Sequence, residues 1–483
     1  MKKYIVTAAL VMTLVLVHAP TVTADREVSV KINGVYVEFP DQQPIIVDSR
    51  TLVPVRGVFE QLGFGVYWEI ESPQTATLIN DYYTVHITIG SEVFTVNGRS
   101  YTLDVPAQLI GARTMLPIRA VLEAVGLVVD WDNATWTVLI SGYVTGPAYI
   151  TIQGERFSTA LTELRLESLD LTNEDIAPLR YMTNLTRLSL VDNAITDVSP
   201  LSELGRLTRL NISLNQVTDI SPLGNLTNLT ELDLWGNQFV DISSLNNLTN
   251  LTSFIMFDNV NFNGDISVVK NFSNLTFLKL GSRWISDFTP IGGLVNLEYL
   301  YLHEVTQFSD LSIVEDLTSL TLLSIEHSRI RDFSPIRNLQ KLTTLEIISP
   351  QTKIDDISYL FLDSLPNLTD LSLTRSHISD ISALRSLTNL TRLNLFHNQI
   401  SDICPLSELT NLTRLTLSVN QISDINALSG LTNLTHLWLF RNQISNIAPL
   451  TNLTNLTWLD LENNPITDWS PVAHVRVVHG RPR

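Results

Sequence analysis

Leucine and isoleucine recur at a fixed spacing over the larger, C-terminal part of this sequence. The pattern L-x-x-L-x-L-x-x-N-x-I-x-D-I-x-P-L starts at Leu161 and repeats about fourteen times, mostly at intervals of 22 residues. A single repeat of this length cannot bury its own leucines, so the pattern predicts a solenoid of stacked repeats. The first leucines of the repeats are Leu161, Leu185, Leu207, Leu229, Leu251, Leu275, Leu297, Leu320, Leu342, Leu368, Leu390, Leu412, Leu434 and Leu456.

Each repeat contains a short stretch in which apolar and polar residues alternate, as in LNLF over residues 393–396. A period of two predicts a strand with one buried face. Stacked strands of this kind form a parallel sheet on the concave face of an α/β-type solenoid, with neighbours about 4.8 Å apart. The pair Ser199-Pro200 and its counterparts predict a short helical turn on the convex face, with the serine as N-cap and the proline in the first turn.

An asparagine follows most of the predicted strands, at the point where the chain turns away. We expect its side-chain amide to bond backbone groups of adjacent repeats, because buried backbone groups need partners. Other residues replace the asparagine in the middle of the array, and we expect looser turns around residues 280–376. These replacements are Arg283, Val305, Ser328, Pro350 and Ser376.

The segment after the asparagine carries a regular aspartate, such as Asp197 or Asp402. Local turn and capping bonds explain this column of aspartates better than a stacked calcium site does. Cys404 stands in one repeat where others have serine, and we interpret it as a tolerated small side chain rather than a reactive thiol.

A duplication occupies residues 25–143. The segments SRTLVPVRGVFEQLGFGVYWE and ARTMLPIRAVLEAVGLVVDWD align without a gap at an offset of 63 residues. Each copy predicts a short amphipathic helix, a glycine that caps it (Gly63 or Gly126) and a strand. The strand-like segments VSVKINGVYVEF and EVFTVNGRSYTL each contain an Asn-Gly hairpin signal. The block is therefore a small α+β domain. We interpret its arginines Arg56 and Arg119 as structural, with ligand binding as the alternative.

The first 24 residues have the pattern of a secretory signal peptide. Lys2 and Lys3 precede an apolar run, and small residues end at Ala24, where we expect cleavage. The run is shorter than a membrane-spanning helix requires, and no later stretch is apolar enough to span a bilayer. The predicted organisation is a signal peptide over 1–24, an α+β domain over 25–143, a solenoid cap over 144–160 and about fourteen repeats over 161–483.

Charge and composition narrow the possible partners. The formal net charge of −18 makes the chain a poor binder of nucleic acid or of anionic membranes. Cys404 is the only cysteine, so no intramolecular disulfide can form, and packing alone must stabilise an exported protein. The sequence contains no phosphate-binding glycine loop, no metal-spaced His/Cys cluster and no nucleophile elbow. We therefore expect no enzyme activity, no catalytic residue, no cofactor and no bound metal ion.

The candidate binding residues are those that vary at the exposed strand positions of the concave face. Aromatic side chains gather there in two groups, and exposed aromatics are enriched at binding hot spots. Cross-strand stacking that merely stabilises the sheet is the alternative. Arginines on the same face, Arg187 and Arg209 among them, are candidates for binding acidic groups of a partner. The predicted contact residues are Trp235, Phe257, Phe277, Tyr299, Tyr301, Arg392, Phe396, Arg414, Trp438, Phe440 and Trp458.

Two family resemblances complete this picture. The segments NGVYVEF, QQPIIVDSRTLVPVRGVFEQLG and RTMLPIRAVLEAVG resemble the copper amine oxidase N-terminal-like domain of exported Gram-positive proteins. That resemblance implies a twisted antiparallel sheet around a helix, without copper chemistry. The 22-residue repeats, with turns of the NQISDISPL type, resemble the leucine-rich repeats of internalins over about residues 161–472. This second resemblance implies recognition of a protein on the concave face.

The function expected from these observations is that of a secreted or cell-surface binding protein. Its solenoid recognises a protein, in preference to a glycan, and its N-terminal domain associates with the cell wall or envelope. The alternative is a structural envelope spacer that attaches through the N-terminal domain and has no specific partner.

Overall fold

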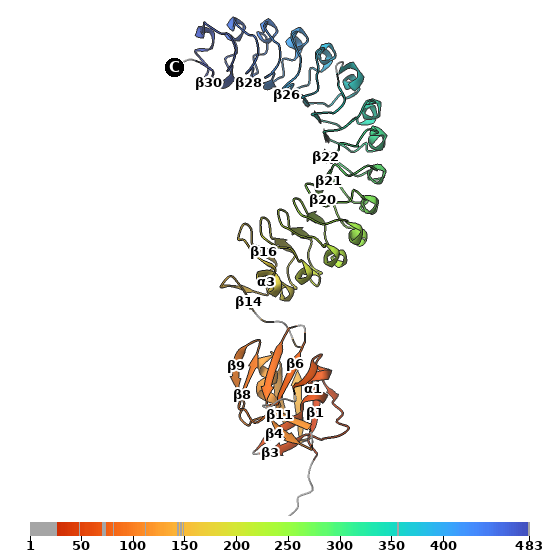
Figure 1. The fold of residues 1–483 in the computed structure, drawn as a ribbon, viewed down its shortest axis with the longest axis vertical. Helices are drawn as coiled ribbons and strands as arrows, with labels where there is room; N and C mark the ends of the chain where they lie inside the picture. The colour runs from red at the N-terminus through yellow and green to blue at the C-terminus, as the bar shows by residue number, and fades with distance from the viewer. Residues whose placement is uncertain are drawn as a thin grey trace, which may run out of the picture. The chain divides into compact units, whose positions relative to one another are not determined.

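A computed structural model describes residues 27–481, except positions 48, 70–73, 81, 112, 143, 145–146, 148 and 355–356. The predicted signal peptide, residues 1–24, lies outside the described residues. The chain divides into two compact units, Met1–Pro147 and Ala148–Arg483 (Figure 1). Each unit has its own apolar core.

The N-terminal unit builds its described part from short strands and two helices. Both Asn-Gly pairs turn with positive φ at both residues, as the hairpin signal predicts, and Gly63 and Gly126 follow the helices with φ of +84° and +88°. The elements are β1 (Ser29–Ile32), β2 (Val35–Tyr36), β3 (Ile45–Val47), β4 (Arg50–Pro54), α1 (Val55–Gln61), β5 (Gly65–Glu69), β6 (Thr75–Ile79), β7 (Thr84–Thr88), β8 (Val93–Val96), β9 (Arg99–Thr102), β10 (Gln108–Ile110), β11 (Arg113–Pro117), α2 (Ile118–Ala124), β12 (Val128–Asp132) and β13 (Thr137–Ser141).

The two sequence copies exchange elements in this unit. Over the described residues the sheets have the orders β10-β11-β4-β3, β12-β13-β1-β2 and β5-β6-β7-β8-β9. The equivalent strands β4 and β11 pair antiparallel about Val53 and Leu116, which occupy the same place in the two copies. This pairing places a local two-fold axis between the copies. The hairpin β1–β2 of the first copy joins β12–β13 of the second, with β1 parallel to β13.

This arrangement corrects one expectation. The resemblance implies one antiparallel sheet around a helix, whereas the described residues form three sheets, one with a parallel pair, and two helices. The reason is the duplication, which supplies each element twice. Both helices bury equivalent apolar positions against the common core, Val55, Val58 and Phe59 in α1, and their counterparts in α2.

The second unit is the predicted solenoid. Figure 1 shows its strands on the inner side of an arc and its short helical turns on the outer side. Among the described residues, one sheet joins fifteen parallel strands in sequence order. The elements of the unit are β14 (Tyr149–Ile152), β15 (Glu155–Ser158), β16 (Glu163–Arg165), α3 (Asn173–Ile176), β17 (Arg187–Ser189), β18 (Arg209–Asn211), β19 (Glu231–Asp233), β20 (Ser253–Met256), β21 (Phe277–Gly281), β22 (Tyr299–His303), β23 (Leu322–Glu326), β24 (Thr344–Ile348), β25 (Asp370–Thr374), β26 (Arg392–Asn394), β27 (Arg414–Thr416), β28 (His436–Trp438), β29 (Trp458–Asp460) and β30 (Val477–His479).

Both ends of the solenoid carry elements outside the regular repeat. The hairpin β14–β15 begins the unit and contributes Ile150 and Ile152 to the solenoid core. At the other end β30 adds a strand beyond the fourteen that the leucine spacing predicts, and it pairs with β29. The sequence did not predict β30 because it begins 19 residues after the start of β29 and lacks the leucine pattern.

The convex turns are 3₁₀-helical, and the capping group differs from the prediction. Ser199 and its counterparts are the first residues of these turns, not N-caps. The carboxylate two residues earlier accepts the first N–H instead, as Asp197 does from Ser199 at 2.8 Å. Asp402 does the same for Cys404, and its carboxylate raises the pKa of the exposed Cys404 thiol, chiefly through a hydrogen bond. Local capping is therefore confirmed as a role of the aspartate column.

The repeated asparagines form the expected ladder, here called the Asn ladder. It comprises Asn193, Asn215, Asn237, Asn259, Asn398, Asn420, Asn442 and Asn464. The Asn420 amide donates to the carbonyls of Leu395 and Leu417 at 3.0 Å, and its oxygen accepts from Ile400 N–H at 3.1 Å. One side chain thus links two consecutive repeats.

The middle repeats, where the Asn ladder is absent, are not loosened in their strands. The strands β21 to β25 each have five residues, whereas β17 to β19 and β26 to β29 have three. Main-chain pairing continues through the extra positions, for example between Gly281 and His303. These strands are therefore continuously paired, because the backbone itself bonds to the next repeat, and the expectation of looser turns around residues 280–376 stays a prediction.

Candidate functional site: the concave face of the solenoid

Alternate residues of each strand form three rows across the concave face. Row 1 contains the first strand residue, such as Tyr299. Row 2 lies two residues later, at Tyr301, and row 3 two residues later again, at His303. The residues between the rows are core leucines such as Leu300 and Leu302. Side chains can therefore vary in the rows without disturbing the core.

The first predicted aromatic group is one continuous cluster over β19 to β22, here called the aromatic patch. Trp235 and Phe257 stack with ring centroids 5.1 Å apart and planes 11° apart. Phe277 lies 6.0 Å from Tyr299 and 5.5 Å from Tyr301. The patch is defined as Trp235, Phe257, Phe277, Tyr299 and Tyr301, together with Lys279 and His303.

Lys279 and His303 connect the two halves of the aromatic patch. The Lys279 ammonium lies 4.1 Å from the centre of the Phe257 ring and 6.0 Å from that of Tyr301. The His303 ring meets Phe257 edge-on at 5.5 Å, although their strands are separated by β21. Gly281 lies between them, and a Cβ there would lie 2.5 Å from the His303 carbonyl oxygen and 3.0 Å from Phe257 Cβ. The missing side chain lets these two rings touch.

Exposure within the aromatic patch is uneven. Tyr299 is 39% exposed, and Trp235, Phe277 and Tyr301 are half-buried. Phe257 is only 8% exposed because Trp235 and Lys279 cover it, which differs from the solvent-facing ring expected from the sequence. Phe257 thus supports the patch more than it presents surface.

Burial and charge also shape this region. Asp233, in row 2 beside the patch, has a raised pKa, mainly because it is buried. The pKa of Tyr301 is raised as well, first by burial and then by the carboxylate of Glu346. The imidazole of His303 contacts the carboxylate of Glu326. A partly desolvated site of this kind strengthens polar contacts made by a ligand.

The second predicted aromatic group is divided into separate contacts. Phe396 and Phe440 lie 6.5 Å apart across an intervening strand. Trp438 stacks on His436 at 5.7 Å. Trp458 meets the His479 ring at 4.8 Å. The structure therefore gives three small clusters over β26 to β30 rather than one surface.

The predicted arginines are mostly engaged within the sheet. Arg392 forms an ion pair with Asp370 of the neighbouring strand. Arg187 pairs with Glu163, and Arg209 with Glu231, each at 3.1 Å. Arg414 instead lies 5.8 Å from the Trp438 ring centre. Exposed pairs of this type contribute little to stability, so they restrain the arginine side chains more than they strengthen the fold.

Sequence reasoning missed some residues of the site. Lys279 and His303 occupy rows 2 and 3, and their row positions could have revealed them. Trp284 and Val260 lie beyond the strands and are 60% and 71% exposed. They line a depression of about 480 Å³ that also includes Asp258, the acceptor for the Trp235 indole N–H. The strand pattern holds no signal for these loop residues.

Metal-ligand groups and membrane-spanning helices are not found in the described part of the chain. No group of three or more His, Cys, Asp or Glu side chains there is arranged as metal ligands would be. No described helix is both long and apolar enough to cross a membrane.

Comparisons with known families agree with the two-unit organisation. The copper amine oxidase N-terminal domain matches residues 31–140. A model of two leucine-rich repeats matches residues 183–225, 366–408, 388–430, 410–452 and 432–474. No curated protein matches the sequence.

Solved structures are similar to the solenoid. An internalin (InlF) from Listeria monocytogenes is 33% identical, with 68% of this chain and 91% of that chain covered and a TM-score of 0.52. A leucine-rich repeat protein from Leptospira interrogans is 21% identical, with 66% and 90% covered and a TM-score of 0.54, and this likeness concerns the fold alone. The chain therefore belongs to the internalin-type leucine-rich repeat proteins, with an N-terminal unit of the copper amine oxidase N-terminal domain type.

Proposed function

We propose that this protein is exported and that its solenoid binds a protein partner through the concave face, with the aromatic patch as the main anchor. The observation that carries this proposal is the continuity of the patch, in which seven side chains from four neighbouring strands touch one another. Large aromatic side chains that cluster on a rigid surface are typical of binding hot spots.

The surroundings of the aromatic patch support the same role. Toward the start of the solenoid, row 1 carries charges of both signs that pair with each other, Glu163 with Arg187 and Arg209 with Glu231. Toward its end the aromatics are dispersed. An apolar centre with a polar periphery is the usual composition of a protein interface. We propose that Phe396, Trp438, Phe440 and Trp458, with Arg392 and Arg414, make secondary contacts.

The experiment replaces the most accessible anchor. Tyr299 and Tyr301 become serine together, which leaves Leu300 and Leu302 of the same strand in the core. The full chain carrying Tyr299→Ser/Tyr301→Ser and the unchanged protein are each cross-linked in extracts of surface proteins. The proteins captured by each are then quantified by mass spectrometry. We expect recovery of the partner to fall at least tenfold, because hot-spot aromatics contribute about 2 kcal/mol or more each.

A matched control lies on β17. Arg187→Ser creates the same Ser/Ser pair in rows 1 and 2, since Ser189 already occupies the second position. This variant should capture the partner as well as the unchanged protein does. Equal recovery with all three proteins, or an equal loss with both variants, would contradict the proposal and favour a spacer without a specific concave partner.

A further inference from the structure

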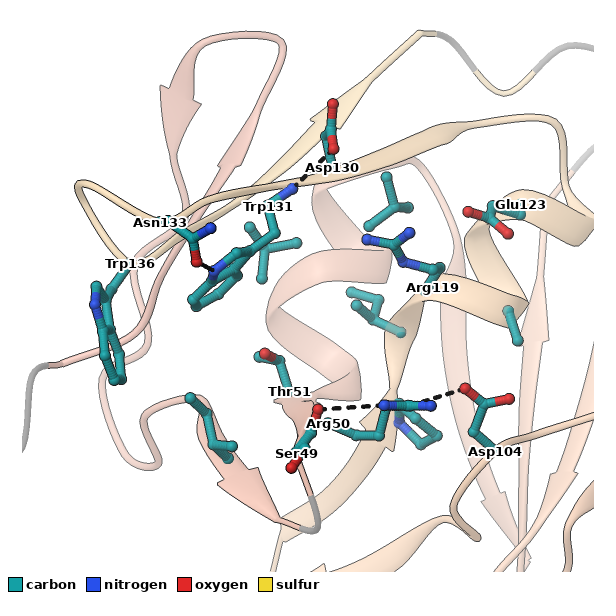
Figure 2. Close-up of a pocket in the computed structure, with 16 residues that line it drawn as sticks. Ser49, Arg50, Thr51, Asp104, Arg119, Glu123, Asp130, Trp131, Asn133 and Trp136 are labelled. Carbon is teal, nitrogen blue, oxygen red and sulfur yellow. Dashed lines mark hydrogen bonds and ion pairs between the residues drawn. The ribbon is translucent and has the colours of Figure 1, made fainter.

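A pocket of the N-terminal unit has a smaller counterpart in the same unit. The larger, here called pocket A, has a volume of about 710 Å³ and is lined by β4 of one sequence copy and by α2 and β12 of the other (Figure 2). Pocket B, of about 300 Å³, is lined by the equivalent residues with the copies interchanged. The pockets are thus related by the local two-fold axis.

Equivalent side chains recur in the two pockets. Arg50, Arg119 and Trp131 line pocket A, and their counterparts 63 residues away in the alignment line pocket B. Arg50 pairs with Asp104 at 2.8 Å, while Arg113 pairs with Asp41 in the other half. Each ion pair therefore joins one copy to the other. Two equivalent pockets that differ in detail permit an internal comparison.

The first difference concerns the helix arginine. Arg56 in pocket B forms an ion pair at 3.2 Å with Glu60, four residues later. Arg119 has Glu123 at the same spacing but forms no ion pair with any described residue. Figure 2 shows its guanidinium directed into pocket A, away from Glu123. Pocket A therefore offers a guanidinium that forms no ion pair within the described part of the chain.

The second difference concerns the aromatic wall. In the strand register, Trp68 pairs with Ala76 in the first copy as Trp131 pairs with Val138 in the second. The residue two positions before this partner is Gln74 in pocket B and Trp136 in pocket A. Trp131 and Trp136 meet edge-on at 6.2 Å. The Trp131 indole N–H donates to Asn133 at 2.8 Å, which fixes the ring. Pocket A thus has two half-buried indole rings where pocket B has one.

The lining of pocket A defines the chemistry of a ligand. An unpaired guanidinium favours a carboxylate, which it can bind through two parallel hydrogen bonds. Indole rings offer flat apolar surface. Glu123, Asp130 and Asn133 add hydrogen-bonding groups, and the two carboxylates require donors from the ligand, which a purely apolar acid lacks. A sugar ring with hydroxyl groups and one carboxylate supplies all three, and the volume suits small ligands.

We propose that pocket A binds an acidic saccharide, whose carboxylate is held by Arg119 and whose ring packs on Trp131 and Trp136. Pocket B lacks the free arginine and the second indole, so it does not bind this ligand. The proposal gives the N-terminal unit a binding activity of its own, independent of the concave face of the solenoid.

Titration calorimetry on the full chain tests this assignment. The probes are N-acetylmuramic acid, glucuronic acid and tri-galacturonic acid, with N-acetylglucosamine, glucose and galactotriose as their neutral counterparts. We expect at least one acidic probe to bind, with at least tenfold higher affinity than its neutral counterpart. Binding of no acidic probe, or equal binding of acidic and neutral probes, overturns the proposal.

Variants in the two pockets provide matched controls. Arg119→Gln should remove the preference for the acidic probe. Trp136→Gln, which introduces the residue of pocket B, should lower the affinity for the acidic probe at least tenfold. Arg56→Gln makes the same change in pocket B and should leave the affinity unchanged. An equal loss with Arg56→Gln and Arg119→Gln would place binding outside pocket A. Thermal melting of each variant distinguishes a lost site from a lost fold.

Discussion

The end repeats and the middle repeats of the solenoid satisfy the backbone groups at the end of the strand in different ways. At the ends, an amide side chain of the Asn ladder satisfies buried backbone groups of adjacent repeats, and the strands stop after three residues. In the middle, five-residue strands carry main-chain pairing further along. A repeat can therefore lose its most regular polar residue without losing order. The aromatic patch spans the junction between the two kinds of repeat.

The largest effect that this comparison predicts is for Asn420→Ala in the end repeats. The change removes the acceptor of the Ile400 N–H. It also removes one of the two amide donors to each of the Leu395 and Leu417 carbonyls, which keep Asn398 and Asn442. We expect a loss of about 2 kcal/mol or more in local stability, since one unsatisfied buried group costs about 1–3 kcal/mol and each lost hydrogen bond about 1 kcal/mol. Hydrogen exchange of the flanking repeats measures it.

Asn411→Ala is the control for this change. Asn411 lies directly before Leu412, the first leucine of the repeat that contains Asn420; it is exposed and donates to a single carbonyl, that of Thr388. It should cost no more than about 1 kcal/mol. Similar losses for Asn411 and Asn420 would mean that burial in the Asn ladder has no special importance.

A second, smaller effect, the loss of stability at low pH, should occur in both the end repeats and the middle repeats. The pKa values of Asp265, Asp332, Asp402 and Asp468 are lowered, each first by the N–H that the carboxylate accepts. Because the folded pKa lies below the unfolded value of about 3.9, this stability is complete above that pH and is lost as the pH falls through the folded pKa. Thermal unfolding between pH 6 and pH 2.5 should show the loss in both regions.

The corresponding asparagine variants separate this effect from general acid unfolding. Asparagine keeps an oxygen acceptor but does not titrate, so replacing these four aspartates together should flatten the decline below pH 4. A decline of unchanged steepness would show that other carboxylates control acid stability.

The smallest effect is expected for Ser328→Ala in the middle repeats. Ser328 occupies the Asn ladder position, is fully buried, and its hydroxyl has no hydrogen-bond partner among the residues that the structure describes. Removing an unsatisfied group should change stability by less than about 0.5 kcal/mol, or raise it slightly. Ser376→Ala is the control, because the Ser376 hydroxyl donates to Thr374 at 3.1 Å. A cost for Ser328 above that for Ser376 would contradict this account.

Some features of the solenoid can be predicted from the sequence spacing, and others depend on tertiary contacts. The alternation of Leu393 and Leu395 fixes which residues face outward, so the rows could be predicted. The contact between Phe257 and His303 could not, because it joins strands two repeats apart through the space left by Gly281. The capping role of Asp197 was ambiguous for a local reason, since both the aspartate and the serine after it can cap a turn.

In the N-terminal unit, even less of the tertiary structure could be predicted from the sequence. The duplication reveals two similar helices, but nothing in the alignment says that each copy completes its sheets with strands of the other. Arg56 and Arg119 look equivalent in sequence, and only the ion pair of Arg56 with Glu60 separates them. Pocket A could therefore be identified only from the folded structure and not from the repeated sequence motif.

The exchanged strands of this unit have a consequence for how it can be divided. Because β4 pairs with β11, and β1 with β13, a chain cut between the copies would expose two sheet edges and half of a shared core. The segment that repeats in the sequence is therefore not a segment that folds alone. A half-length chain would need a second copy of itself, and a symmetric dimer of two such chains would carry two identical pockets. Joining both halves in one polypeptide frees each pocket to acquire its own residues.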